Sequence, residues 1–127
     1  MQDRVTYEFS IIRLVPKVER AEFINIGVLL FSKRKKYLAM KSKLDEARIT
    51  AFSSAVDIAM IDDYLKAWSA ICAGAPKGGP IGQLDMPLRF RWLTAAKSTI
   101  IQCSPTHPGL CEQPEAVLEM LFERYVL

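Results

Sequence analysis

The chain has 127 residues, of which 50% are hydrophobic and 24% are charged, a balance that is typical of a globular protein and argues against disorder. Its length fits a single domain over residues 1–127 and leaves little room for a second one. The formal net charge of +3 is only mildly basic, so charge by itself argues neither for nor against a nucleic-acid partner, whose binding requires many phosphates to be neutralised.

The first part of the chain predicts three consecutive strands. Residues 7–15 are rich in aromatic and β-branched residues and end at Pro16, which cannot donate to a strand pair. Residues 23–31 and 37–41 predict two more strands, and the short links between the three indicate an antiparallel meander. Strict alternation places four aliphatic residues of the second strand on one face: Ile24, Ile26, Val28 and Leu30. Gly27 is costly there unless it marks a bulge or a close approach.

The middle of the chain changes to helical spacing. Residues 45–54 predict one helix, and a second one follows Asp57, its expected N-cap, and stops at Gly74. The second helix carries an apolar stripe at spacings of three and four: Ile58, Ile61, Leu65, Trp68 and Cys72. Residues 74–82 hold four of the six glycines and predict a loop.

The remaining elements complete an α+β domain. Residues 88–94 are ambiguous between a helical turn and a short strand, and residues 99–103 predict a fourth strand. Prolines then indicate a loop, and Pro114 opens a last helix. The order is β-β-β-α-α-β-α, with an antiparallel sheet of about four strands and helices packed on it. We expect ten residues in the core: Ile24, Ile26, Val28, Leu30, Ile61, Leu65, Trp68, Leu118, Leu121 and Phe122.

Three cysteines are an odd number, which excludes a complete disulfide framework. Residues 1–4 are polar with no signal-peptide core after them, and the most apolar run, residues 24–31, is too short to span a bilayer. We therefore expect a cytoplasmic protein that does not cross a membrane.

The single histidine, His107, lies four positions from both Cys103 and Cys111. Thiolate and imidazole are ligands that zinc prefers, and a Cys–His pair can also form a nucleophile. The spacing matches no familiar zinc motif, however, and closeness in sequence is weak evidence for a catalytic pair. We expect no metal and no cofactor, and His107 is the best candidate for a catalytic residue.

Four arginines are the most informative polar residues: Arg13, Arg20, Arg89 and Arg91. Arg13 shares a strand face with Phe9 and Ile11, so its guanidinium lies beside apolar surface and needs a partner. Half-buried arginines pair with carboxylates or bind anions. One alternative is internal pairing with Glu8, Glu19 or Glu22. The other is an anionic ligand or an acidic partner.

A run of basic residues, 33–36, lies at the tip of a predicted hairpin. Such a tip can contact phosphates or acidic protein surface, or can be a solvated turn that protects the sheet edges from association. No aromatic residue interleaves with it, so base stacking has no support.

Three sets of residues together match one family pattern. The first runs from Ser10 to Val28, the second comprises 89–93 and 98–110, and the third is 115–124. In order, they cover nearly the whole chain and resemble a bacterial family filed as domain of unknown function 3037. The resemblance implies no activity, but the pattern retains nine polar or aromatic residues: Arg13, Arg20, Asn25, Arg89, Trp92, Ser98, Gln102, Ser104 and His107. With Arg91, these are the candidate ligand-binding residues.

The resemblance also implies a context. Members are often encoded beside a protein that resembles the HipA-type serine/threonine kinases. The leading hypothesis is therefore a non-catalytic accessory or protein-interaction module with a HipA-like kinase as partner. The alternatives are a small enzyme or binding domain for an anionic ligand, which would use the arginines and His107, and a weak nucleic-acid binder that would use the 33–36 turn. The sequence does not set the oligomeric state.

Overall fold

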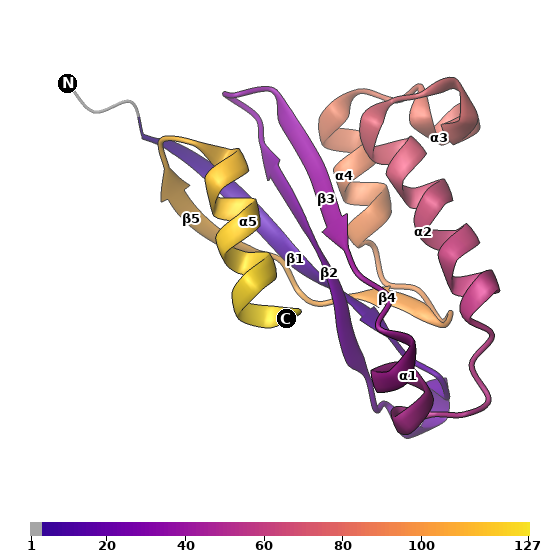
Figure 1. Ribbon diagram of the computed structural model, residues 1–127. Coiled ribbons are helices and arrows are strands. Elements are labelled where there is room, and N and C mark those ends of the chain that lie inside the picture. Colours follow the sequence, from indigo (N-terminus) through magenta and orange to yellow (C-terminus); the bar gives the residue numbers. More distant parts are fainter. Residues whose placement is uncertain (1–3) are drawn as a thin grey trace.

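The computed structural model describes residues 4–127. Residues 1–3, which belong to the polar start used above to argue against a signal peptide, lie outside the described residues. A five-stranded antiparallel sheet lies at the centre, with helices on both of its faces (Figure 1). Its strands are β1 (Val5–Leu14), β2 (Ile24–Ser32), β3 (Tyr37–Ser42), β4 (Ile101–Cys103) and β5 (His107–Cys111). The strand order is β3-β2-β1-β4, and β5 also pairs with β1. The predicted α+β class and antiparallel sheet are confirmed.

The first three strands form the predicted meander. The β1–β2 connection contains a short 3-10 helix, η1 (Val18–Arg20), and the 33–36 turn joins β2 to β3. A register shift follows the Ile12–Gly27 pair, because the next pair is Arg13–Asn25, which leaves Ile26 as a bulge. Of the two alternatives for Gly27, the bulge lies at the adjacent Ile26, and the close approach is at Gly27 itself, where a Cβ would lie 2.9 Å from the Lys41 carbonyl oxygen.

This bulge changes the face on which later residues of β2 lie. Ile24 and Ile26 pack with Leu29 in one core, whereas Val28 and Leu30 pack in the other. The predicted common face for these aliphatic residues was therefore wrong, because one extra residue shifts the alternation along the strand by one position.

One face of the sheet carries most of the helices: α1 (Glu46–Phe52), α2 (Ile58–Ala73) and α4 (Met86–Thr94). The predicted N-cap of α2 is confirmed, since Asp57 Oδ1 accepts a hydrogen bond from the Met60 amide at 3.2 Å. Gly74 ends this helix with a φ of 67°, also as predicted. The expected loop after it instead contains two short helical turns, η2 (Pro76–Gly78) and α3 (Gly79–Gly82). The ambiguous segment 88–94 belongs to α4.

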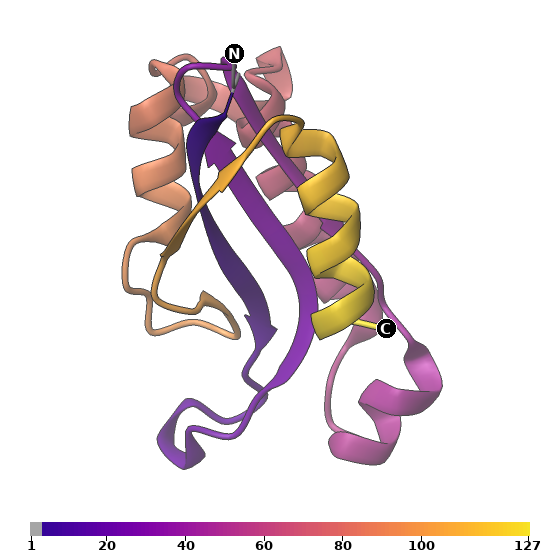
Figure 2. The ribbon, with the colours of Figure 1, turned by 90° about the vertical axis from the view of Figure 1, so that its left-hand side faces the viewer.

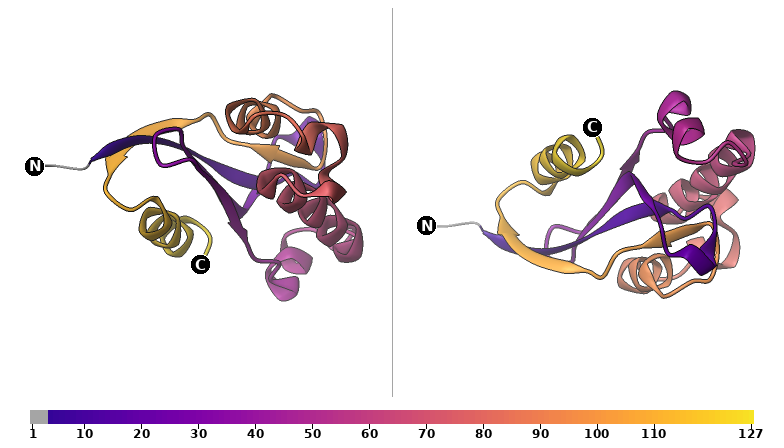
Figure 3. Two further views of the ribbon diagram at one scale, coloured as in Figure 1. Left: turned by 90° about the horizontal axis from the view of Figure 1, so that it is seen from above. Right: turned by 90° about the horizontal axis from the view of Figure 1, so that it is seen from below.

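The opposite face is covered by a single helix, α5 (Pro114–Tyr125), which begins at the predicted proline. Views along the sheet show α5 on one side and α2 and α4 on the other (Figure 3). The core beneath α5 is the smaller of the two and comprises Ile11, Val28, Leu30, Leu118, Leu121, Phe122 and Val126. All ten residues predicted for the core are buried.

The strand β5 was not predicted, because prolines indicated a loop there. It follows β4 along the same edge of β1, and Ser104 continues the pairing between them. The Ser104 amide donates to the Ile11 carbonyl at 2.8 Å, and Ser104 Oγ accepts from the Ile11 amide at 2.8 Å. Pro108 is tolerated because β5 pairs with β1 alone, so a missing amide interrupts no second ladder.

Candidate functional site

Two of the four candidate arginines form ion pairs. Arg91 on α4 donates two hydrogen bonds to the carboxylate of Glu8 on β1, at 3.0 and 2.9 Å. Arg20 on η1 pairs with Glu22, and both side chains are largely exposed. The structure therefore contains the internal pairing that was one of the two alternatives for these arginines.

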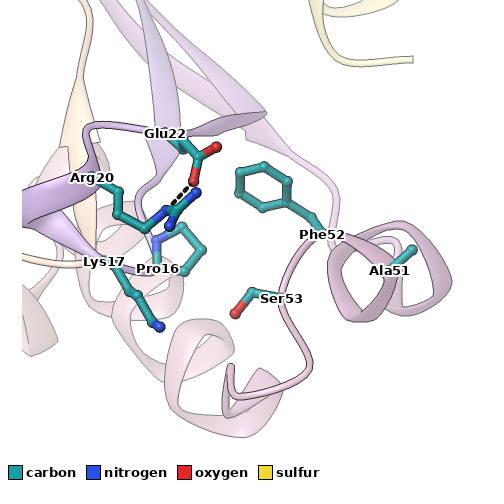
Figure 4. Close-up of a pocket in the computed structure, with 7 residues that line it drawn as sticks. All are labelled: Pro16, Lys17, Arg20, Glu22, Ala51, Phe52 and Ser53. Carbon is teal, nitrogen blue, oxygen red and sulfur yellow. Dashed lines mark hydrogen bonds and ion pairs between the residues drawn. The ribbon is translucent and has the colours of Figure 1, made fainter.

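The ion pair of Arg20 borders a pocket of about 390 Å³ between η1 and the end of α1. In Figure 4 the Phe52 ring lies across from the carboxylate of Glu22, and the side chains of Lys17 and Ser53 approach from the other end. The guanidinium already faces a carboxylate in this pocket, which leaves less of its charge for an external anion.

Arg89 lies on α4, and its guanidinium reaches the C-terminal end of α2. Its Nη1 donates to the Leu84 carbonyl at 2.8 Å, and its Nη2 lies 3.5 Å from the carbonyl oxygen of Cys72. A positive charge at a helix C-terminus is favourable because the last carbonyls carry partial negative charge. Arg89 thus fastens the 74–85 connection to α2.

Trp92 and Ser98 are exposed and lie near the C-terminal end of α4. Lys97, between them in sequence, donates to the carbonyls of Trp92 and Leu93 and places its Nζ 4.7 Å from the centre of the Trp92 ring. Burial lowers the pKa of Lys97. Lys97 thus caps carbonyls in the last turn of α4, on the side of the sheet away from α5.

Arg13 differs from the other three arginines. Neither Arg13 nor Arg89 forms an ion pair within residues 4–127, and the Nε of each is covered and has no hydrogen-bond partner there. Arg89 nevertheless donates two hydrogen bonds from its Nη atoms, whereas the guanidinium of Arg13 donates none among the described residues. The ring of Phe23 lies over the guanidinium, with its centre 4.0 Å from Cζ. Arg13 is therefore the candidate arginine for which the described part of the chain provides no acceptor.

Arg13 is the middle residue of a polar row across three strands. It faces Asn25 on β2 and Gln102 on β4 in the sheet register, and residues directly opposite each other share a face. The Asn25 amide donates to the Tyr125 carbonyl at 3.1 Å, and the Gln102 amide donates to the Thr99 carbonyl at 2.9 Å. The row joins the end of α5 and the 95–100 connection to the centre of the sheet.

Next to this row is a pocket of about 310 Å³, called the Arg13 pocket below. Its lining residues are Phe9, Ile11, Arg13, Ser104, His107 and Tyr125. The Phe9 ring lies between two of them, 5.2 Å from the His107 ring and 6.3 Å from the Tyr125 ring, centre to centre. None of the six is acidic. A hollow with aromatic walls and one guanidinium can hold an anionic group that carries an apolar stem.

The structure separates the two residues of the proposed Cys–His pair. Cys103 lies opposite Ile12 and donates from Sγ to the Leu93 carbonyl at 3.4 Å on the α4 side, whereas His107 lines the Arg13 pocket on the α5 side. Burial also raises the pKa of Cys103, which disfavours the thiolate. Within residues 4–127, no group of three or more His, Cys, Asp and Glu side chains is placed to hold a metal ion.

Sequence reasoning missed two aromatic residues of this region. Phe23 precedes β2, and Tyr125 is the last residue of α5 and is 40% exposed. No local signal in the sequence identifies them, because each meets the pocket or its arginine only through tertiary contacts. The basic residues 33–36 are exposed on the β2–β3 turn, and nothing beyond their charge supports nucleic-acid binding there.

The fold and the site together define a small α+β protein in which helices cover both faces of one antiparallel sheet and an aromatic pocket holds an arginine that is unpaired among residues 4–127. Residues 9–126 match the family described as "Protein of unknown function (DUF3037)", and the chain belongs to this family. No curated protein and no solved structure matches it. In the described range, 4–127, no helix is long and apolar enough to cross a membrane.

Proposed function

We propose that this protein is a non-catalytic interaction module that binds a partner protein through the surface around the Arg13 pocket. The observation that carries the proposal is the difference among the four arginines. Arg20 and Arg91 pair with Glu22 and Glu8, and Arg89 donates from both Nη atoms to backbone carbonyls. Arg13 has neither an ion-pair partner nor a hydrogen-bond acceptor for its guanidinium within residues 4–127.

The surroundings of Arg13 have the composition of a binding surface. Phe23 lies against the guanidinium and Tyr125 lines the pocket, and they expose 44% and 40% of their surface. Aromatic residues and arginine are the types most enriched among residues that dominate the energy of protein interfaces. A catalytic reading finds less support, because the Cys–His pair is separated by the sheet.

A HipA-like kinase is the partner that we propose to test first, on the strength of the family resemblance alone. The proposed unit is a single domain over residues 1–127 that acts in the cytoplasm without a cofactor. The co-purified complex also provides the sample on which the oligomeric state of this domain is measured.

The test is native co-purification of the tagged full chain from its own host, with bound proteins identified by mass spectrometry. We expect a stoichiometric partner that is lost in the double variant Phe23→Ala, Tyr125→Ala. Leu88→Ala is the matched control, since Leu88 is 53% exposed on α4, on the opposite side of the sheet. Equal capture by all three proteins, or no partner at all, contradicts the proposal.

A second candidate is a small enzyme or binding domain for an anionic ligand. One observation favours it: Arg13 and His107 line the same pocket, so a bound anion would lie within reach of a general acid or base. Turnover by the isolated protein that His107→Ala abolishes and Phe23→Ala preserves would replace the interaction module with this enzyme.

A further inference from the structure

We infer that the Arg13 pocket receives the carboxylate of a glutamate or aspartate on a segment of the partner protein; this rests on the proposed function and names the chemistry that the surface recognises. Three other pockets of the described residues have weaker claims, since an acidic residue already lines each of them: Glu22, Asp45 and Glu112. The Arg13 pocket contains no such residue.

The first step concerns the guanidinium. Arg13 is half-buried on the central strand of the sheet, and its Nε has lost water without gaining an acceptor in the described part of the chain. Its Nη groups also donate no hydrogen bond there, so an acceptor that a ligand brings to them recovers free energy for a guanidinium that has already lost part of its hydration. A charge-assisted hydrogen bond to a carboxylate recovers the most.

The second step concerns the shape of the acceptor. The centre of the Phe23 ring lies 4.0 Å from Cζ, and Nε is covered, so the two Nη groups are the donors left for a ligand. A planar carboxylate matches these two groups with two parallel hydrogen bonds. Phosphate, with its higher charge, loses more hydration against walls made of Phe9, Ile11 and Tyr125.

The third step concerns the size of the ligand. A volume of about 310 Å³ is at the lower limit of small-molecule sites and suits one acidic side chain with its apolar stem. The exposed rings of Phe23 and Tyr125 extend the apolar surface beyond the pocket. A polypeptide on both sides of the acidic residue would cover these rings, whereas a free small carboxylate would leave them in water.

The probe for the experiment is the peptide acetyl-Leu-Glu-Leu-amide, with acetyl-Leu-Gln-Leu-amide as its uncharged match. Binding is followed on the full ¹⁵N-labelled chain through the Arg13 Nε–H resonance and the backbone amides of β1. We expect a saturable shift with the glutamate peptide and binding at least about tenfold weaker for the glutamine peptide, because the latter offers no charge to the guanidinium.

Three variants assign the effect to Arg13. Arg13→Met is expected to abolish the preference for glutamate, and Arg13→Lys, which keeps the charge, is expected to weaken it, because an ammonium group lacks the planar fork. Arg91→Met is the control, since Arg91 is already paired with Glu8. Equal binding of the two peptides, an unchanged preference in Arg13→Met, or no saturable shift with the glutamate peptide overturns the inference. Glutarate binding as tightly as the peptide also overturns it and indicates a free small carboxylate.

Co-purification with the same variants separates this inference from the proposed function. A partner captured equally by wild type and Arg13→Met leaves the interaction module intact and refutes the carboxylate at Arg13. Absence of any partner, together with a glutamate-specific shift of Arg13, refutes the host interaction and keeps the carboxylate site. If a second copy of the chain is the only protein captured, the partner segment belongs to the chain itself, and the inference fails as stated.

Discussion

The two faces of the sheet differ in how completely helices close them. On one face α1, α2 and α4 cover a core that includes Trp68 and Phe90, and on the other α5 lies alone over a core of seven residues (Figures 1 and 3). A helix of 12 residues is about 18 Å long, whereas a strand of 10 residues extends about 33 Å. One helix therefore cannot cover the whole face, and the η1 connection lies beyond the C-terminal end of α5 (Figure 2).

The difference explains why residues of one type have different roles. Arg89, on the closed side, donates to carbonyls at the end of α2, so its charge stabilises the fold. Arg13, on the open side, lines a pocket, and its guanidinium donates no hydrogen bond among residues 4–127. The closed face thus provides Arg89 with two backbone acceptors, whereas the incompletely covered face leaves the Arg13 guanidinium available for a ligand.

The largest expected effect compares the two cores. Phe90 is fully buried and stacks on Phe31 with ring centres 5.0 Å apart, so Phe90→Ala is expected to lower the free energy of unfolding by about 3–5 kcal/mol. Phe122→Ala in the smaller core should fall at the lower end of that range, because a core beside solvent can collapse around a cavity. Urea unfolding of both variants measures this, and a larger loss for Phe122→Ala would contradict the comparison.

The next effect concerns Ser104, which borders the open pocket but is itself buried. Ser104→Ala removes the acceptor of the buried Ile11 amide and is expected to cost about 1–3 kcal/mol of unfolding free energy. Ser98→Ala is the control on the preceding exposed segment and should stay within about 0.5 kcal/mol of wild type. If Ser104→Ala is as stable as Ser98→Ala, the hydroxyl is available for a ligand and the bridge between β4 and β5 has little energetic weight.

Alkaline pH is expected to weaken the closed face through Cys72. Burial raises its pKa from 9.0 to about 12 in the folded protein. Because the folded pKa lies above the unfolded one, this contribution is intact below pH 9.0 and is lost as pH rises toward 12, by about 1.4 kcal/mol per pH unit. Lys97, whose pKa burial lowers, acts with the opposite sign.

The measurement is urea unfolding under reducing conditions at several alkaline pH values. Cys72→Val removes the titrating group while retaining an apolar side chain, so its stability should fall less steeply with pH than that of wild type. Parallel pH profiles for the two proteins would show that the Cys72 thiol is not the source of the alkaline effect.

The smallest expected effect is the difference in unfolding free energy between the Arg89→Met and Arg13→Met variants. Arg89→Met should lower the free energy of unfolding by about 1–2 kcal/mol, because the Leu84 carbonyl loses its donor and the end of α2 loses a positive charge. Arg13→Met should change it by no more than about 0.5 kcal/mol, or raise it, since no ion pair within residues 4–127 is broken. A larger loss for Arg13→Met would mean that Arg13 stabilises the fold and that its pocket is not kept for binding.

The sequence by itself determined the features that depend on near neighbours. The three-strand meander, the Asp57 cap, the Gly74 stop and the start of α5 at Pro114 all follow from local spacing and backbone chemistry. The buried residues were also predictable, because hydrophobicity at regular spacing selects them before any fold is known. The family resemblance covered the same ground and is confirmed over residues 9–126.

Tertiary structure alone decided which residues meet. Pro108 could join a strand only because β1 offered an edge, and the bulge in β2 sent Val28 and Ile26 to opposite faces. The partner of Arg91 lies 83 residues away, and the Asn25 amide reaches a carbonyl 100 residues away. Local sequence sets the spacing of side chains along one element, but pairing depends on how elements pack. For that reason the sequence could only identify Arg13 and Arg91 as equal candidates. The fold shows that Arg91 is paired with Glu8 and that Arg13 lines an open pocket.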